Sequence, residues 1–227
     1  MNIHLNNAIA SLKKDILILC SMVENAVRSA VDAAVENDAE KALKVIDYDE
    51  TIDKKEIAIE EECLKILALH QPVASDLRYV VACLKVNNDL ERIGDLGANI
   101  AKRAKAIAEG KKCKWELDFK PMMDVTRSML KGALDSLIYM NEVLALEVIE
   151  KDDIVDDYNS QMFKDIKALI KKHPENVDYY LNMLSVSRYL ERIADLTTNI
   201  CEDIIYMNRG DIVRHGGLPS IRKIVQN

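Results

Sequence analysis

Residues that interrupt helices are scarce in this chain. Only 7 glycines and 4 prolines occur among its 227 residues. Glycine is conformationally too free for a helix interior, and proline lacks the amide hydrogen that a helix needs there. The good helix formers Ala, Leu, Lys and Glu are plentiful. This composition predicts a protein made of long helices.

An excess of positive charge is also missing. The chain has 31 Lys and Arg residues against 38 Asp and Glu residues, which gives a formal net charge of -7. Proteins bind nucleic acids mainly by neutralising phosphates with basic side chains. We therefore expect no nucleic-acid partner.

No apolar run is long enough to span a bilayer. The run near the N-terminus covers residues 16–20, whereas a membrane-spanning helix needs roughly 20 apolar residues. The first residues also lack the basic segment and the small-residue cleavage site of a signal peptide. We expect a cytoplasmic protein that does not insert into a membrane.

The cysteines show no pattern of a disulfide framework or a zinc site. They are odd in number, occur singly and never form a CxxC pair. Reduced thiols in a cytoplasm fit this usage better than disulfides do. We interpret them as small core residues: Cys20, Cys63, Cys83, Cys113 and Cys201.

Apolar residues at spacings of three and four predict six long helices. Their expected ranges are 5–36, 39–69, 76–108, 122–150, 152–171 and 177–207. The order of two helices, a proline-containing break and a third helix occurs twice. We therefore predict an all-α fold, a tandem repeat of two three-helix bundles. The predicted parts are a first bundle over 1–110, a linker over 111–121, a second bundle over 122–210 and a C-terminal tail over 211–227.

One acidic segment, which we call the repeated phrase, occurs twice in the sequence. The sequence LERIGDLGANI covers residues 90–100, and LERIADLTTNI covers residues 190–200. The two agree at eight of eleven positions without a gap. A repeated supersecondary unit is the simplest physical cause of such self-similarity.

Within each copy, carboxylates recur on one face of the helix. Glu91 and Asp95 are four residues apart, as are Glu191 and Asp195. Carboxylates at this spacing repel each other by a few tenths of a kcal/mol when they are merely exposed. A cation that joins them would remove this cost.

Similar acidic pairs occur in the preceding helix of each half. If the second and third helices of a half pack antiparallel, the pairs can face each other and form an all-oxygen site for a hard cation such as Mg, Mn, Ca or ferric iron. These pairs are Asp49 with Asp53, and either Asp152 with Asp156 or Asp153 with Asp157.

Two other interpretations of the acidic pairs remain open. Acidic residues four apart also occur elsewhere, where a solvated helix face explains them: Asp32 with Glu36, Glu36 with Glu40, and Glu56 with Glu60. In addition, Arg92 and Arg192 could each pair with a carboxylate of another helix, which would make the repeated phrase a structural clamp.

Catalytic motifs are not evident. No histidine follows a glutamate in the ExxH pattern of ferritin-like carboxylate sites. A GxxxxGK phosphate loop is absent as well. We expect a protein that is not an enzyme.

Several segments together resemble the PhoU family of regulators associated with phosphate uptake. They are DETID at 49–53, QPVASDLRYVVACLKVNNDLERIGDLGANIAKRA at 71–104, SRYLERIADLTTNICEDIIY at 187–206 and GDIVRH at 210–215. The resemblance covers nearly the whole chain and preserves the order and spacing of these segments.

This resemblance implies tandem three-helix bundles whose acidic pairs bind metal ions, with iron or zinc as the expected metals and magnesium or manganese as alternatives. The implied first site consists of Asp49, Asp53, Glu91 and Asp95. The implied second site consists of Asp152, Asp156, Glu191 and Asp195. Asn99 and Asn199 are weaker candidates on the same helix faces.

The resemblance also implies a function. PhoU-like proteins exert negative control on the phosphate regulon by linking the phosphate ABC transporter to a sensor histidine kinase, and they commonly form homodimers. The alternatives are a metal-binding helical bundle with an oxidase or iron-storage role, and a metal-free scaffold.

Overall fold

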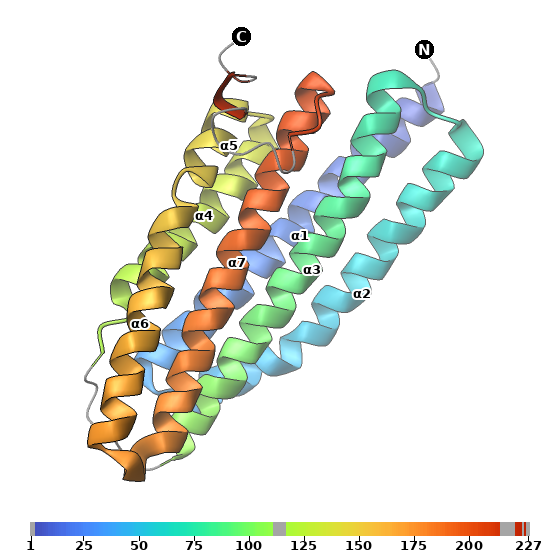
Figure 1. Cartoon of the computed structure of the whole chain (residues 1–227). Helices are drawn as coiled ribbons and strands as arrows, with labels where there is room; N and C mark the ends of the chain where they lie inside the picture. Colours follow the sequence, from blue (N-terminus) through green and yellow to red (C-terminus); the bar gives the residue numbers. More distant parts are fainter. Residues whose placement is uncertain (1–2, 111–116, 214–220, 224, 226–227) are drawn as a thin grey trace.

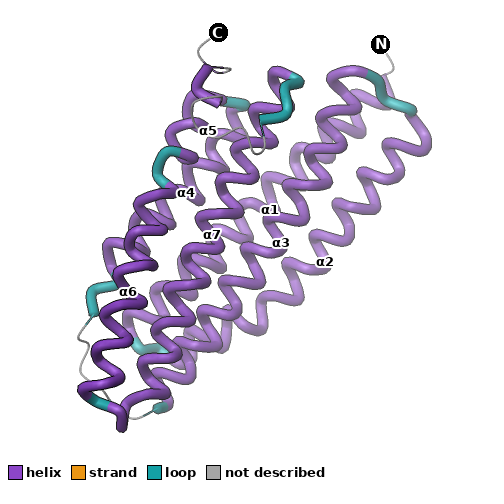
Figure 2. Tube along the Cα trace, viewed as in Figure 1, coloured by secondary structure: helices purple, strands orange, loops and turns teal. Residues whose placement is uncertain are grey.

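The computed structural model describes residues 3–110, 117–213, 221–223 and 225. These residues form helices joined by short loops and contain no strand, which confirms the all-α prediction (Figure 2). Within the same residues, no helix combines the length and the apolar character needed to cross a membrane. Cys113, Trp115 and His215 lie outside the described residues.

The first half contains α1 (Ile3–Glu36), α2 (Ala39–His70) and α3 (Ala74–Glu109). The Asp38 side chain caps α2 by accepting a hydrogen bond from the backbone N–H of Lys41 at 2.9 Å. Gln71 ends α2 in a left-handed conformation, and Pro72 follows it. These boundaries lie close to the predicted ones because caps and breakers are local signals.

The second half contains four α-helices and one short 3-10 helix. They are α4 (Lys120–Tyr139), α5 (Glu142–Ile149), α6 (Asp152–Lys172), η1 (Pro174–Asn176) and α7 (Val177–Arg209). The tandem arrangement of two helical bundles is confirmed, with α4 and α5 together corresponding to α1.

The prediction of one continuous helix over 122–150 was wrong. Met140 adopts a left-handed conformation with φ 49° and ends α4. The next residue, Asn141, accepts hydrogen bonds from the backbone N–H groups of Val143 and Leu144 and so caps α5. Asparagine competes for backbone groups in this way because its side chain is short and polar.

The described residues include only parts of the predicted linker and tail. Residues 111–116 of the linker are outside the described residues, and α4 already begins at Lys120. Part of the tail packs back on the second bundle, since Val213 and Ile221 are buried and the Arg222 Nε atom lies 2.6 Å from a carboxylate oxygen of Glu150.

Four long helices lie side by side in one layer in the order α6, α7, α3, α2, with α1, α4 and α5 behind them (Figure 1). The central pair, α3 and α7, is antiparallel, because Lys85 near the start of α3 bonds Asp203 near the end of α7 at 3.2 Å. Buried apolar residues of both halves form one continuous core. This layer carries the repeated acidic phrase on its two central helices.

Gly94 allows α3 to approach α2 closely beside Asp95. A Cβ atom at position 94 would lie 3.1 Å from the Cγ2 atom of Ile52, which is itself buried between Asp49 and Asp53 on α2. The equivalent residue in the repeated phrase is Ala194. The absence of a side chain at Gly94 therefore brings the acidic residues of α2 and α3 together.

We expect Gly94→Val to lower the free energy of unfolding by about 1–3 kcal/mol, because the added methyl groups overlap Ile52. Ile52→Ala, which is destabilising by itself, should make room for the added methyl groups. Urea unfolding of Gly94→Val, Ile52→Ala and the double variant measures the effect. The double variant should lose less stability than the sum of the two single losses. Strictly additive losses would show that Gly94 is not held against Ile52.

Candidate metal centres

The first acidic site lies between α2 and α3. Asp49 and Asp53 lie one helical turn apart on α2, and Asp95 meets them from α3. Each of the three residues offers one carboxylate oxygen, and these oxygens all lie within 4.8 Å of one another. The packing of two helices thus brings three negative charges close enough to share one cation.

Glu91 belongs to the same group of charges. Burial raises its pKa, and so do the nearby carboxylates of Asp95, Asp53, Glu56 and Asp49. Burial likewise raises the pKa of Asp49, with further contributions from Asp95 and Asp53, whereas Lys102 lowers it. The negative charges of Asp53 and Asp95 therefore make Asp49 and Glu91 more costly to ionise, which places all four predicted residues of the first site near one another.

The second acidic site lies between α6 and α7. Burial raises the pKa of Asp152 from 3.8 to about 7, and the carboxylates of Asp195, Asp156, Asp153 and Glu191 contribute to this shift. Burial also raises the pKa of Glu191, with further contributions from Asp195 and Asp156, and it raises the pKa of Asp195, with a further contribution from Asp156. The structure therefore brings all four predicted residues of this site together.

The two sites differ in compactness. Among the described residues, only the first site has three ligand oxygens within the 4.8 Å range. The glycine at position 94 becomes Ala194 in the second half, so α7 carries a side chain where α3 has none. We attribute the tighter first site to this difference.

A buried oxygen without a hydrogen-bond donor occurs at the same place in both sites. The Oδ1 atoms of Asp49 and Asp152 are buried and have no hydrogen-bond partner within the described structure. Asp49 and Asp152 begin the two aligned acidic pairs of α2 and α6. An unsatisfied buried carboxylate oxygen is costly, and a coordinated cation would satisfy it.

The chemistry of both sites suits a hard cation. All eight predicted ligands are carboxylates, which magnesium, manganese, calcium and ferric iron accept. Zinc sites more often include cysteine or histidine, and neither belongs to these two sets. The residues therefore fit a hard metal ion better than zinc.

Glu56, which the sequence analysis interpreted as part of a solvated helix face, adds a carboxylate beside the first site. Burial raises its pKa first, followed by Glu60 and Asp53, and its Oε1 atom accepts a hydrogen bond from the Asn87 side chain at 2.8 Å. Glu56 lies seven residues after Asp49, and this spacing places the two side chains on the same side of α2. The equivalent residue in α6 is Asn159, which accepts a hydrogen bond from Ser187 at 2.8 Å.

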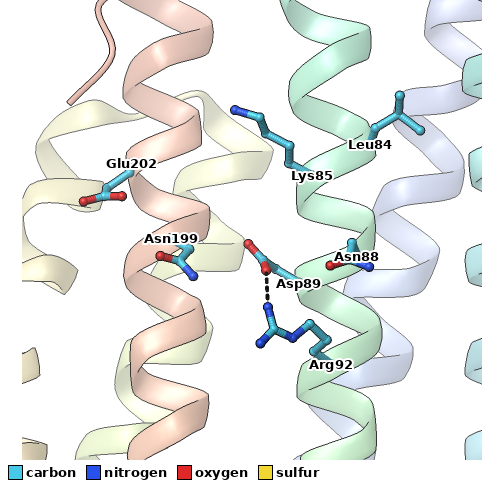
Figure 3. Close-up of a pocket in the computed structure, with 7 residues that line it drawn as sticks. All are labelled: Leu84, Lys85, Asn88, Asp89, Arg92, Asn199 and Glu202. Carbon is cyan, nitrogen blue, oxygen red and sulfur yellow. Dashed lines mark ion pairs between the residues drawn. The ribbon is translucent and has the colours of Figure 1, made fainter. Parts of the chain in front are cut away.

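The arginine of the first repeated phrase pairs within its own helix. Arg92 lies 3.7 Å from Asp89 at the groove between α3 and α7, so this ion pair does not join two helices as the clamp hypothesis required (Figure 3). Asn199 lines the same groove from α7. Basic and acidic side chains alternate there, and the groove is distinct from the acidic sites.

Removing the charge of Asp152 should stabilise the metal-free protein above neutral pH. The raised pKa means that the folded state holds the proton more tightly than the unfolded chain does, so the stability that this proton contributes is fully present below about pH 4 and is lost as the pH rises to about 7. For Asp152→Asn we expect a gain of about 1 kcal/mol in the free energy of unfolding at about pH 8, after allowance for solvent screening of this partly exposed group.

Urea unfolding of chelator-treated protein at about pH 4 and at about pH 8 provides the measurement. Asp157→Asn is the matched control. Asp157 is an exposed carboxylate on the same helix and contributes to none of the shifts described above. Equal gains for the two variants, or a loss of stability in Asp152→Asn at the higher pH, would contradict the proposed cost of the buried charge.

Comparison with known proteins identifies the domain that the chain contains. The family model described as "PhoU domain" matches residues 16–104 and 119–204. The phosphate-specific transport system accessory protein PhoU homolog of Aquifex aeolicus is 36% identical over 203 residues, which are 89% of this chain and 92% of that protein. The homolog of Pseudomonas putida is 35% identical over 97% of this chain and 87% of that protein.

Solved structures agree with this assignment. The crystal structure of PhoU from Pseudomonas aeruginosa matches with a TM-score of 0.87 at 33% identity, covering 91% of this chain and 99% of that one. The phosphate transport system regulatory protein PhoU from Streptococcus pneumoniae matches with a TM-score of 0.84 at 31% identity, covering 92% of this chain and 99% of that one. Sequence and fold lead to one conclusion: the chain belongs to the PhoU family.

Proposed function

We propose that this protein is a cytoplasmic regulator of phosphate uptake that represses the phosphate regulon. In this proposal it contacts the phosphate ABC transporter and a sensor histidine kinase and links the state of one to the activity of the other. The observation that carries the proposal is its close similarity, over almost the whole length, to proteins named as phosphate transport accessory or regulatory proteins.

The surface of α2 is suited to binding other proteins. Leu43, Ile57 and Leu64 are large apolar residues with 44%, 53% and 53% of their surfaces exposed. Spacings of seven and fourteen residues place them on one side of the helix. An apolar stripe of this kind supports a role in protein contact, including the homodimer that we propose, and the protein needs no enzymatic activity for it.

We further propose that both acidic sites bind a hard metal ion. The ion would neutralise the facing carboxylates at each site and hold α3 against α2 and α7 against α6. The buried Oδ1 atoms of Asp49 and Asp152 support this role, because nothing else in the described structure satisfies them. Bound metal would then stiffen the helical layer that meets the partners.

Deletion of the gene tests the regulatory role. In cells with ample phosphate, a reporter driven by a phosphate-regulated promoter should rise toward its starvation level after deletion, because repression is lost. The wild-type gene should restore repression. Unchanged reporter activity in both high and low phosphate would contradict the proposal.

Complementation with variants tests the contribution of the acidic sites. We expect the double variant Asp53→Asn, Asp156→Asn to restore repression less completely than wild type, because each site loses one carboxylate on the helix that faces the repeated phrase. Asp157→Asn serves as the control and should complement fully. Immunoblots establish that the variants accumulate equally, and full repression by the double variant would separate regulation from the acidic sites.

A further inference from the structure

A groove of about 380 Å³ lies between α6 and α7 beside the second acidic site. Side chains from both helices form its walls, and Glu191 forms the edge that it shares with the acidic site. The lining residues are Asn159, Ser160, Phe163, Lys164, Leu184, Arg188 and Glu191. Two of these side chains are cationic, and one is a carboxylate.

The equivalent surface of the first half has the opposite charge. Aligning Asp49 with Asp152 also aligns buried positions, since Ile52, Ile59 and Cys63 then correspond to Val155, Met162 and Ile166. With this register and that of the repeated phrase, the residues equivalent to the groove lining are Glu56, Ile57, Glu60, Glu61, Leu84, Asn88 and Glu91. These seven positions therefore carry four carboxylates and no cation in the first half, and two cations and one carboxylate in the second half.

Hydrogen-bond donors dominate the groove of the second half. Neither Lys164 nor Arg188 forms a salt bridge within the described residues, although Arg188 is close enough to lower the pKa of Glu191. The Asn159 Oδ1 atom accepts a hydrogen bond from Ser187 at 2.8 Å, which leaves its amide N–H groups available to donate. Ser160 adds a hydroxyl group.

We propose that this groove binds a small phosphate-class oxyanion. The ammonium of Lys164 and the planar guanidinium of Arg188 approach it from the two different helices, and such groups make strong charge-assisted hydrogen bonds to tetrahedral oxyanions. Among the residues that line the groove, these two positive charges exceed the single negative charge of Glu191, while the carboxylates of Asp156 and Asp195 lie beyond Glu191 in the second acidic site. The first half cannot bind the same ligand, because its four carboxylates would repel it.

This inference concerns ligand binding by the purified chain and is independent of the regulatory function proposed above. An effect on gene expression can be present or absent whatever the groove binds. Conversely, failure of the binding experiment would leave the contacts with transporter and kinase untouched.

Calorimetric titration of the chelator-treated, full-length protein with inorganic phosphate tests the proposal. Chelation removes metal ions that could themselves capture phosphate. Arg188→Asn and Lys164→Glu place the residues of the first half, Asn88 and Glu61, at the equivalent positions. We expect saturable binding by wild type and a loss of affinity of about tenfold or more in each variant, since each removes a charged donor.

Lys54→Gln is the matched control, because Lys54 is an exposed lysine of α2 that pairs only with Glu50 on its own helix in the described structure. It should leave phosphate affinity unchanged. Arg188 and Lys164 are exposed, so the variants should keep the wild-type melting temperature, and circular dichroism checks this. Lack of saturable binding by wild type, or equal affinity in wild type and the two groove variants, would overturn the proposal.

Discussion

Packing of the repeated helix against its neighbour is the interaction on which both acidic sites depend. Burial of Ile52 beside Gly94 draws α2 and α3 together, and the carboxylates on either side of this contact then have to face one another. Apolar packing thus imposes electrostatic repulsion. The raised pKa values of Asp49 and Asp152 reflect the free energy needed to ionise these buried, crowded carboxylates. A bound proton or metal ion can offset this free energy.

The two halves keep this arrangement but differ around it. Gly94 becomes Ala194, Glu56 becomes Asn159, and the acidic surface beside the first site becomes the groove of Lys164 and Arg188. The shared features serve the packing of each bundle, so they persist in both copies. The differing features lie at the edge of each site, where a substitution changes the local charge without disturbing the core.

Much of the fold was predictable because helix periodicity, proline breaks and the repeated phrase are all local signals. The interruption at Met140 was not, since no breaker occurs in LIYMNEVL and only the cap formed by Asn141 reveals it. Helical spacing placed the acidic residues on common faces but left Asp152 and Asp153 equivalent; tertiary packing buries an oxygen of Asp152 and leaves Asp153 exposed. Placing Glu56 beside the first site likewise required the arrangement of neighbouring helices.

Calorimetric titration of the chelator-treated protein with manganese tests most directly whether the facing carboxylates form metal centres. We predict saturable binding to wild type, partial loss in Asp49→Asn or Asp152→Asn, and complete loss when both substitutions are combined, because each replaces the partly buried carboxylate of one site with a neutral amide. Absence of binding to wild type, or undiminished binding to the double variant, would contradict it.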